Sequence, residues 1–344
     1  MGSLVEDIEE AHRGIRPWVP VSALERSAAL SARLGVEIWL KCEHLQPTGS
    51  FKIRGATNKI RLLGADSRRK GVVTASTGNH GRAVAHAGRA ANVAVTAFAA
   101  RSAPDHKLAA IRALGAELVT VEGDPLDVER RARAHAESVG LPYISPYNDV
   151  EVVAGQGTIG MELLEQRPDL DAVFVSVGGG GLIGGIGTAL KHHRLEARVV
   201  GVWPENSVDL LKRLRPDQVA DATERPTLSD STAGAIEPNS VTIGICRGVI
   251  DETVTVSEAE IADAMRRIAE AEHWITEGSA GVALAGLIKR AEAYRDRSVA
   301  VVLCGRNIAL DTFLAAIGGA EPRGAFTQNR RRTSRGSGAG RSRS

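Results

Sequence analysis

The chain has 344 residues, of which 43% are hydrophobic, which is enough for a large core and for about two domains. Its formal net charge of +2 is unevenly distributed, because residues 321–344 hold seven arginines and one acid and leave 36 basic against 40 acidic residues elsewhere. A mildly acidic body lacks the basic surface of a nucleic-acid-binding protein, so we expect no nucleic-acid partner. The segment 321–344 cannot bury a core and is predicted to be a disordered Arg-rich tail.

Three cysteines, Cys42, Cys246 and Cys304, are spaced too widely for a disulfide framework or a zinc motif, and they favour a reducing setting. The acidic first residues, MGSLVEDIEEAHRGI, lack the apolar core of a signal peptide. No apolar run is long enough to span a bilayer. We therefore expect a cytoplasmic protein without a membrane partner.

Short runs rich in β-branched residues alternate with helical stretches along the chain. The runs predicted to be strands are 36–43, 70–76, 92–98, 116–122, 171–177, 197–203 and 298–304. Helices are predicted at 80–91, 105–114 and 126–139, and a loop is predicted at 215–239. Apolar strands that alternate with helices form parallel sheets buried on both faces, and seven strands suggest two α/β units.

The segment PTGSFKIRGA places Lys52 after a predicted strand and a turn. Its neighbours Phe51 and Ile53 are apolar, and a lysine in such a setting can have a lowered pKa and form a Schiff base. The alternative is a solvated lysine at the start of a helix.

The segment TASTGNHGRA again joins a strand to a helix. Ser76, Thr77 and Asn79 supply side-chain donors, and Gly78 allows close approach of the backbone. Together with the opening of the next helix, they predict a cradle for a carboxylate or a phosphate. An ordinary helix cap is the alternative, although a cap needs only one such residue.

The segment GGGGLIGG, residues 178–185, follows the apolar strand DAVFVSV and precedes a helical stretch. Consecutive glycines let several backbone N–H groups converge on one anion, and this predicts a phosphate site. No Lys-Ser/Thr pair follows, as a Walker loop requires, and no acid is positioned for a ribose. The segment VVLCGRNI brings Cys304 to the end of another strand, where a buried structural thiol is the commoner reading.

In this order and spacing, GSFKIRGA, STGNHGRA, AGQGTIGMELL, VGGGGLIGG and CGRN resemble the fold-type II enzymes that depend on pyridoxal 5'-phosphate (PLP). The serine/threonine dehydratases (threonine ammonia-lyases) and serine racemases are the most similar members. The resemblance implies an α/β fold like that of the tryptophan synthase β subunit, in which each domain is an open, mostly parallel sheet flanked by helices. Residues 1–55 with 151–320 would form the large PLP-binding domain. Residues 56–150 would form the small domain that carries the substrate-carboxylate loop.

The resemblance also implies a role for each matching residue. Lys52 would be the Schiff-base lysine and the base that removes the α-proton. The other cofactor-binding residues would be Phe51 and Gly234 on the two faces of the ring, Asn79 at the phenolic oxygen, Cys304 at the pyridine nitrogen, and Gly178, Gly179, Gly180, Gly181 and Leu182 at the phosphate. The substrate carboxylate would be held by Ser76, Thr77, Gly78, Asn79 and His80.

These roles imply a dehydratase, or ammonia-lyase, that converts L-threonine or L-serine to a 2-oxo acid and ammonia by α,β-elimination. A serine racemase is a second possibility, although Thr77 stands where that enzyme typically has serine. A third is a dehydratase of hydroxyectoine breakdown, which the STGNHGRA and GRNI variants resemble, and a fourth is a non-catalytic protein that binds a phosphate ligand. Asp230 is the only acid in PTLSDSTAG, so no metal site is expected. The family usually forms homodimers, and we expect one here.

Overall fold

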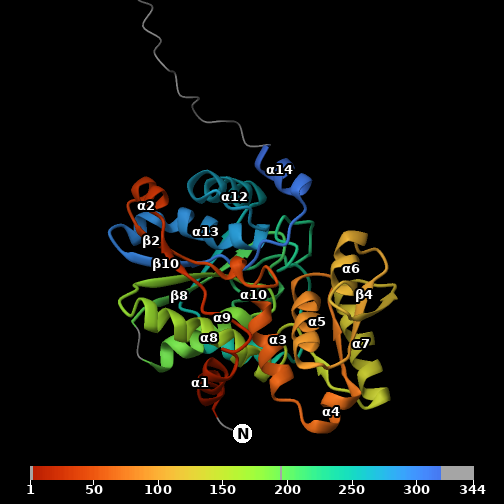
Figure 1. Cartoon of the computed structure of the whole chain (residues 1–344). Helices are drawn as coiled ribbons and strands as arrows, with labels where there is room; N and C mark the ends of the chain where they lie inside the picture. Colours follow the sequence, from red (N-terminus) through yellow and green to blue (C-terminus); the bar gives the residue numbers. More distant parts are fainter. Residues whose placement is uncertain (1–2, 194–195, 319–344) are drawn as a thin grey trace, which may run out of the picture.

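A computed structural model describes residues 3–193 and 196–318, and two sheets organise this part of the chain (Figure 1). The larger sheet has six strands in the order β1-β2-β10-β7-β8-β9, and the smaller has four in the order β5-β4-β3-β6. Every pairing is parallel except that of β1 with β2. The predicted α/β class with open, mostly parallel sheets is confirmed. The predicted Arg-rich tail lies outside the described residues.

The strands of the larger sheet are β1 (Leu24–Arg26), β2 (Glu37–Lys41), β7 (Ala172–Ser176), β8 (Arg198–Pro204), β9 (Glu252–Val256) and β10 (Ser298–Val302). Those of the smaller sheet are β3 (Val72–Ala75), β4 (Val95–Ala100), β5 (Glu117–Val121) and β6 (Tyr143–Ile144). All seven predicted strands are therefore present. The sheets agree with a division into two units, but the boundaries of the two domains stay a prediction.

Helices flank both sheets (Figure 1). Around the larger sheet, α13 (Gly278–Arg290) packs on one face and α9 (Gly181–His192) on the other. The other helices on this side of the molecule are α1 (Leu4–Gly14), α2 (Ala28–Leu34), α8 (Val150–Gln166), α10 (Asp209–Leu214), α11 (Val241–Val249), α12 (Glu258–Glu272) and α14 (Leu310–Gly318), with short 3-10 turns at Glu43–Leu45 and Ala291–Tyr294. The helices beside the smaller sheet are α3 (Lys52–Arg61), α4 (Ala65–Lys70), α5 (Asn79–Ala91), α6 (Asp105–Arg112) and α7 (Pro125–Val139).

The core follows from the continuous apolar strands. Every residue of β7 and β10 is buried, as parallel strands covered on both faces require. Glycine allows helices to approach closely where α3 crosses α8, because a Cβ on Gly155 would lie 2.6 Å from the Cα of Gly55. This crossing fixes the helix whose first residue is Lys52.

Three strands, β1, β6 and β9, were not predicted. Each lies at an edge of its sheet, and two of them have only two or three residues. β1 and β6 are too short to form a recognisable apolar run, and Glu252, Thr253 and Thr255 interrupt the apolar residues of β9. The predicted helices at 80–91, 105–114 and 126–139 correspond to α5, α6 and α7, and residues 215–239 contain no helix or strand.

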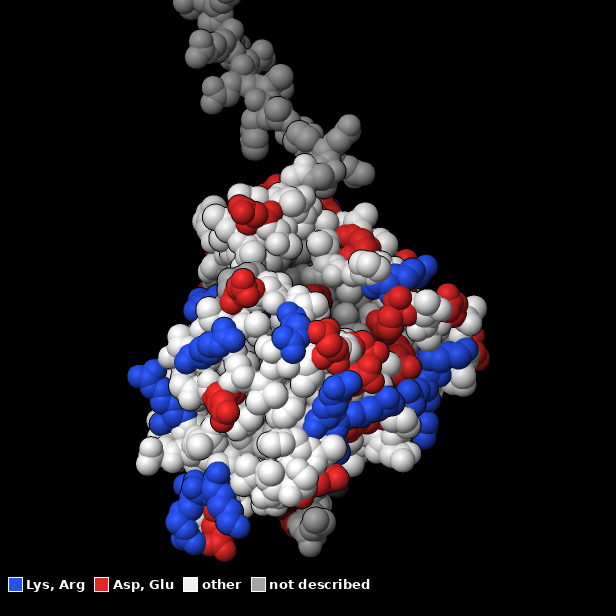
Figure 2. All heavy atoms as spheres, turned by 90° about the vertical axis from the view of Figure 1, so that its right-hand side faces the viewer, with Lys and Arg blue, Asp and Glu red and all other residues white. Residues whose placement is uncertain are grey.

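None of the helices in residues 3–193 and 196–318 is long and apolar enough to cross a membrane. Basic and acidic side chains are interspersed on the face shown in Figure 2, so this face presents no continuous basic surface. Cys42, Cys246 and Cys304 are all buried and free.

Candidate active site

A cavity of about 400 Å³ lies at the carboxyl ends of strands from both sheets. Open α/β sheets bind ligands at this edge. The cavity is lined by every residue predicted to form the site: Phe51, Lys52, Ser76, Thr77, Gly78, Asn79, His80, Gly178, Gly179, Gly180, Gly181, Leu182, Gly234 and Cys304. The fold therefore gathers segments that are more than 250 positions apart in the sequence.

Lys52 is the first residue of α3 and lies at the wall of this cavity. Its Nζ donates a hydrogen bond to the carbonyl oxygen of Pro146 at 2.7 Å and lies 5.3 Å from the centre of the Phe51 ring. Burial lowers the pKa of Lys52 to about 8, although the charge of Glu129 opposes this shift. Near neutral pH, the unprotonated fraction of this amine is therefore much larger than that of an exposed lysine. A nucleophile or a base must be unprotonated to react.

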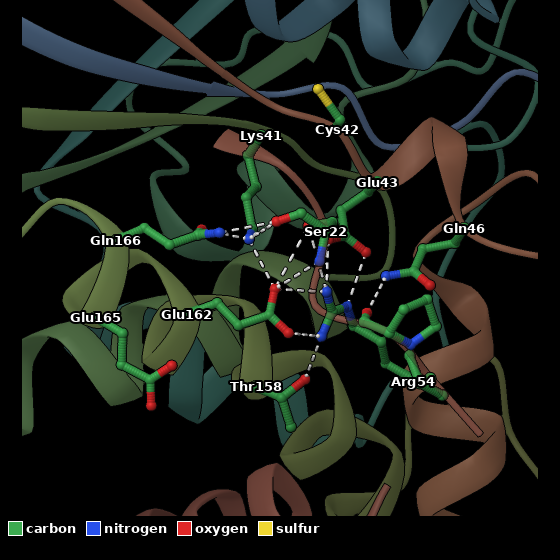
Figure 3. A network of polar contacts seen from close by, with 12 residues as sticks. Ser22, Lys41, Cys42, Glu43, Gln46, Arg54, Thr158, Glu162, Glu165 and Gln166 are labelled. Carbon is green, nitrogen blue, oxygen red and sulfur yellow. Dashed lines mark hydrogen bonds and ion pairs between the residues drawn. The ribbon is translucent and has the colours of Figure 1, made fainter. Parts of the chain in front are cut away.

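A buried network of charges holds the start of α3 in place (Figure 3). Arg54 is fully buried, and its guanidinium binds Glu43 and Glu162, each at 2.7 Å. Lys41 is also buried and contacts the other oxygen of Glu162 at 2.7 Å. Because Arg54 lies only two residues from Lys52, this network fixes the backbone that carries the reactive amine. The sequence predicted a role for Lys52 and none for Arg54.

Two helices point uncapped amino ends at the cavity. Gly180 is the N-cap of α9 and Gly78 is the N-cap of α5, and neither helix has a side-chain cap. The N–H groups of a first helical turn need acceptors, and the helix dipole makes that end attractive to anions. The cavity thus offers one anion site at Gly178–Leu182 and a second at Ser76–His80. This arrangement supports both predicted cradles.

The ring of His80 contributes less than its position in the motif suggests. The side chain is buried, and Nε2 lies 3.1 Å from the carbonyl oxygen of Ile144. Burial and the nearby charge of Lys52 lower the pKa of His80 to about 3. A neutral ring whose one N–H is used by Ile144 cannot donate to a carboxylate, so the predicted role of His80 is left to its backbone N–H.

Cys304 lies just beyond β10 between two serines. Its thiol donates to Ser279 Oγ at 3.2 Å and accepts from Ser176 Oγ at 3.5 Å. Burial, with the charge of Glu277, raises the pKa of Cys304 to about 12, so the thiol stays neutral. A neutral group at this position is a weak partner for a ring nitrogen.

Glu277 is a residue of the site that the sequence reasoning missed. It is buried at the N-cap of α13 and lines the cavity. Its carboxylate accepts hydrogen bonds from four groups: the side chains of Asn79, Ser231 and Ser279 and the backbone of Asn307. The polar stretch TEGS before an apolar helix was the available signal. Glu277 holds Asn79 in place, and through it the start of α5.

Glu129 and Tyr147 were also missed. Both line the cavity, and the Tyr147 hydroxyl donates to Glu129 at 3.3 Å. Burial and the charge of Glu237 raise the pKa of Glu129 to about 7. Glu129 is therefore partly protonated near neutral pH. Nothing in the local sequence of α7 distinguishes it from the other charged residues of that helix.

Residues 15–305 match the profile of a family described as "Pyridoxal-phosphate dependent enzyme". The chain belongs to this family. It is 40% identical over 305 residues to a protein of Thermotoga maritima named L-threonine ammonia-lyase, and the match covers 88% of this chain and 75% of that one. It is 33% identical to a beta-hydroxyaspartate dehydratase of Paracoccus denitrificans, over 89% of this chain and 96% of that one. The solved structure of processed threonine deaminase isoform 2 from Solanum lycopersicum superposes with a TM-score of 0.86 at 32% identity, covering 92% of this chain and 86% of that one.

The cavity suits the cofactor of this family. The uncapped end of α9 can hold a phosphate, and the amine of Lys52 can link to an aldehyde. The neutral thiol of Cys304 can face a ring nitrogen without requiring it to be protonated. When bound, PLP supplies an electron-withdrawing ring that stabilises negative charge at the substrate Cα.

We expect Gly179→Ala to weaken PLP binding by about tenfold or more, because the new Cβ would lie 2.3 Å from Cγ of Tyr147. Either the Tyr147 side chain or the glycine-rich segment 178–181 must then move. Gly244→Ala on α11 is the matched control, since its Cβ would meet nothing within 4 Å. Titrating each apo-protein with PLP and following cofactor absorbance measures the effect. Equal affinities for the two variants would contradict it.

Proposed function

We propose that this protein is a PLP-dependent ammonia-lyase that acts on a β-hydroxy amino acid, with L-threonine and L-serine as the simplest substrates. The products would be a 2-oxo acid and ammonia. The observation that carries the proposal is that the amine of Lys52 and the uncapped amino end of α5 face one cavity. This places a base beside a site for the substrate carboxylate.

The roles of the residues follow from this placement. Ser76, Thr77 and the backbone N–H groups of Asn79 and His80, the first two residues of α5, would hold the carboxylate and so orient the Cα–H bond. Lys52, free once the substrate amine has replaced it, would remove the α-proton, and the β-hydroxyl would leave as water. Cys304 would leave the ring nitrogen unprotonated, and this limits charge delocalisation and favours β-elimination over transamination.

The test is to incubate the purified holoenzyme with L-threonine or L-serine and to measure the 2-oxo acid and ammonia formed. Equal amounts of both products from at least one substrate are expected. D-serine without pyruvate, detected by chiral chromatography, would instead support a racemase. Cofactor absorbance without turnover of any hydroxy amino acid, hydroxyectoine-derived substrates included, would support a binding protein.

We also propose that the protein is a cytoplasmic homodimer. Three buried free cysteines are compatible with a reducing compartment. Sedimentation equilibrium of the holoenzyme would give the mass of the assembly, and the mass of a monomer would contradict the proposal.

A further inference from the structure

The cavity contains two arginines that none of these roles uses. Arg82 ends the first turn of α5, and Arg306 lies two residues beyond Cys304. Both line the cavity with Asn79 and Asn307. They come from different elements, Arg82 from the helix beside the smaller sheet and Arg306 from the end of a central strand of the larger sheet.

Neither guanidinium forms an ion pair with a carboxylate in the part of the chain that the structure describes. Arg82 Nη1 donates to Asn307 Oδ1 at 2.8 Å, whereas its buried Nε has no acceptor in the described part of the chain. Arg306 is exposed, and the hydrogen bonds that the structure gives it, to Gly49 and from Ile308, are made by its backbone. Within residues 3–193 and 196–318, no carboxylate lies at ion-pair distance from either side chain.

The acidic residues that line the cavity leave Arg82 and Arg306 free to bind a ligand. The Arg82 guanidinium contacts Asn307, the residue next to Arg306, so the two arginines lie in the same part of the cavity. Burial lowers the pKa of Arg82, Glu277 opposes that shift, and the charge of Arg306 adds to it. Glu277 is already occupied by its four donors. The other acids of the cavity are also engaged, since Asp230 pairs with Lys107 and Glu129 accepts from Tyr147.

The two anionic groups that the proposed function brings to the cavity do not need these two arginines. The cofactor phosphate has the uncapped end of α9, and the substrate α-carboxylate has the uncapped end of α5. A guanidinium binds a carboxylate through two parallel hydrogen bonds, and a pair of unpaired guanidiniums beside one cavity is suited to an additional carboxylate. In a β-hydroxy amino acid, that group can be carried only by the side chain.

We propose that Arg82 and Arg306 bind a second carboxylate of the substrate, and that the preferred substrate is a β-hydroxy amino dicarboxylate, of which 3-hydroxyaspartate is the simplest. This inference rests on the proposed ammonia-lyase function and specifies its substrate class. The α-proton goes to Lys52, and the β-hydroxyl leaves with a proton as water. One water then replaces the nitrogen, so the net products are a 2-oxo dicarboxylate and ammonia, and no oxidant or reductant is needed.

The first experiment compares kcat/KM of the holoenzyme for 3-hydroxyaspartate, L-threonine and L-serine. We expect the dicarboxylate to be favoured by at least about tenfold, since charge-assisted hydrogen bonds are among the strongest in proteins. The second experiment needs no turnover. It titrates the holoenzyme with L-aspartate and with L-alanine, neither of which has a β-hydroxyl to lose, and follows the cofactor spectrum; L-aspartate should bind at least about tenfold more tightly.

Variants then assign the preference to the two side chains. Arg306→Gln and Arg82→Gln should each lower kcat/KM for 3-hydroxyaspartate by about 10- to 100-fold and should change that for L-threonine by less than about threefold. Arg306→Lys should retain part of the preference for the dicarboxylate, because lysine keeps the positive charge but cannot donate two parallel hydrogen bonds to one carboxylate. Arg89→Gln, an exposed position on the same helix α5, is the matched control and should leave all values unchanged.

The outcomes separate this inference from the function on which it rests. Turnover of L-threonine, combined with equal affinity for L-aspartate and L-alanine, would overturn the substrate class alone. A loss of the same size for both kinds of substrate would also overturn it, because the arginines would then hold the shared α-carboxylate. If no hydroxy amino acid reacts, the ammonia-lyase function fails, and Arg306-dependent selection of L-aspartate would still support a second carboxylate site.

Discussion

We expect Lys52→Ala to lower kcat by at least about 10³-fold, because it would remove both the proposed anchor of the cofactor and the proposed base at the substrate Cα. Lys52→Arg should be equally inactive, since a guanidinium keeps the charge but does not form the covalent link. Both variants should fold and should lack the visible absorption of covalently bound PLP. Lys70→Ala, at the exposed end of α4, removes a lysine without touching the cavity and should retain full activity.

The pH dependence of cofactor capture gives a second measurement of the same amine. Burial lowers the pKa of Lys52 to about 8, so half of the apo-protein carries the reactive, unprotonated amine near pH 8 and most of it does about one pH unit higher. The rate at which PLP becomes covalently bound should therefore rise with pH, reach half its maximum near pH 8 and level off above about pH 9. A rate that continues to rise beyond pH 10, as for an exposed lysine, would contradict the assigned environment. Wild-type rates in Lys52→Ala would contradict the assigned residue.

The predictions from sequence succeeded where one physical requirement dominates a segment. Strands such as β7 and β10 are buried on both faces, and burial demands an unbroken apolar run that is visible in the sequence. The segments 76–80 and 178–182, in each of which a loop leads into a helix, expose backbone N–H groups at the cavity, and glycine with small polar residues is the composition that allows it. The same reasoning gathered these segments correctly, because parallel strands all present their carboxyl ends at one edge of a sheet.

The residues that were missed act through partners that only the fold supplies. Glu277 matters because Asn79, almost 200 positions away, donates to it, and nothing near Glu277 in the chain reveals that contact. Arg82 and Arg306 lie inside recognised motifs, but their lack of partners is a property of the assembled cavity. The pKa of Glu129 is raised because the fold buries its carboxyl and brings the charge of Glu237 near it. Charge environments of this kind depend on contacts between segments far apart in the chain, and sequence periodicity carries no information about them.

Glu162→Gln is expected to destabilise the protein by about 3–5 kcal/mol, the second large effect that the structure predicts. Glu162 is completely buried and binds three cations: Arg16, Lys41 and Arg54, each at 2.7 Å. Glutamine would put a neutral amide in its place. Among the contacts that the structure describes for these cations, the carboxylate of Glu43 would then be the one left to balance their charge (Figure 3). Glu165→Gln on the same helix α8 is the control, because that side chain is 56% exposed and, among the described residues, its one ion pair is with His12. It should change stability by less than about 0.5 kcal/mol. Urea unfolding of the two apo-proteins would measure the difference.

Acid should remove the contribution of Glu162, and this distinguishes its charge from its packing. Burial raises the pKa of Glu162, but Arg54 and Lys41 outweigh burial and hold that pKa well below its ordinary value of 4.5. A carboxyl with a lowered folded-state pKa stabilises fully above its unfolded-state value, and the contribution is lost as the pH falls below that value. The difference in unfolding free energy between wild type and Glu162→Gln should therefore be constant from pH 8 to about pH 5.5 and should shrink as the pH falls towards 3. A difference that stays the same down to pH 3 would mean that shape, and not charge, makes Glu162 necessary.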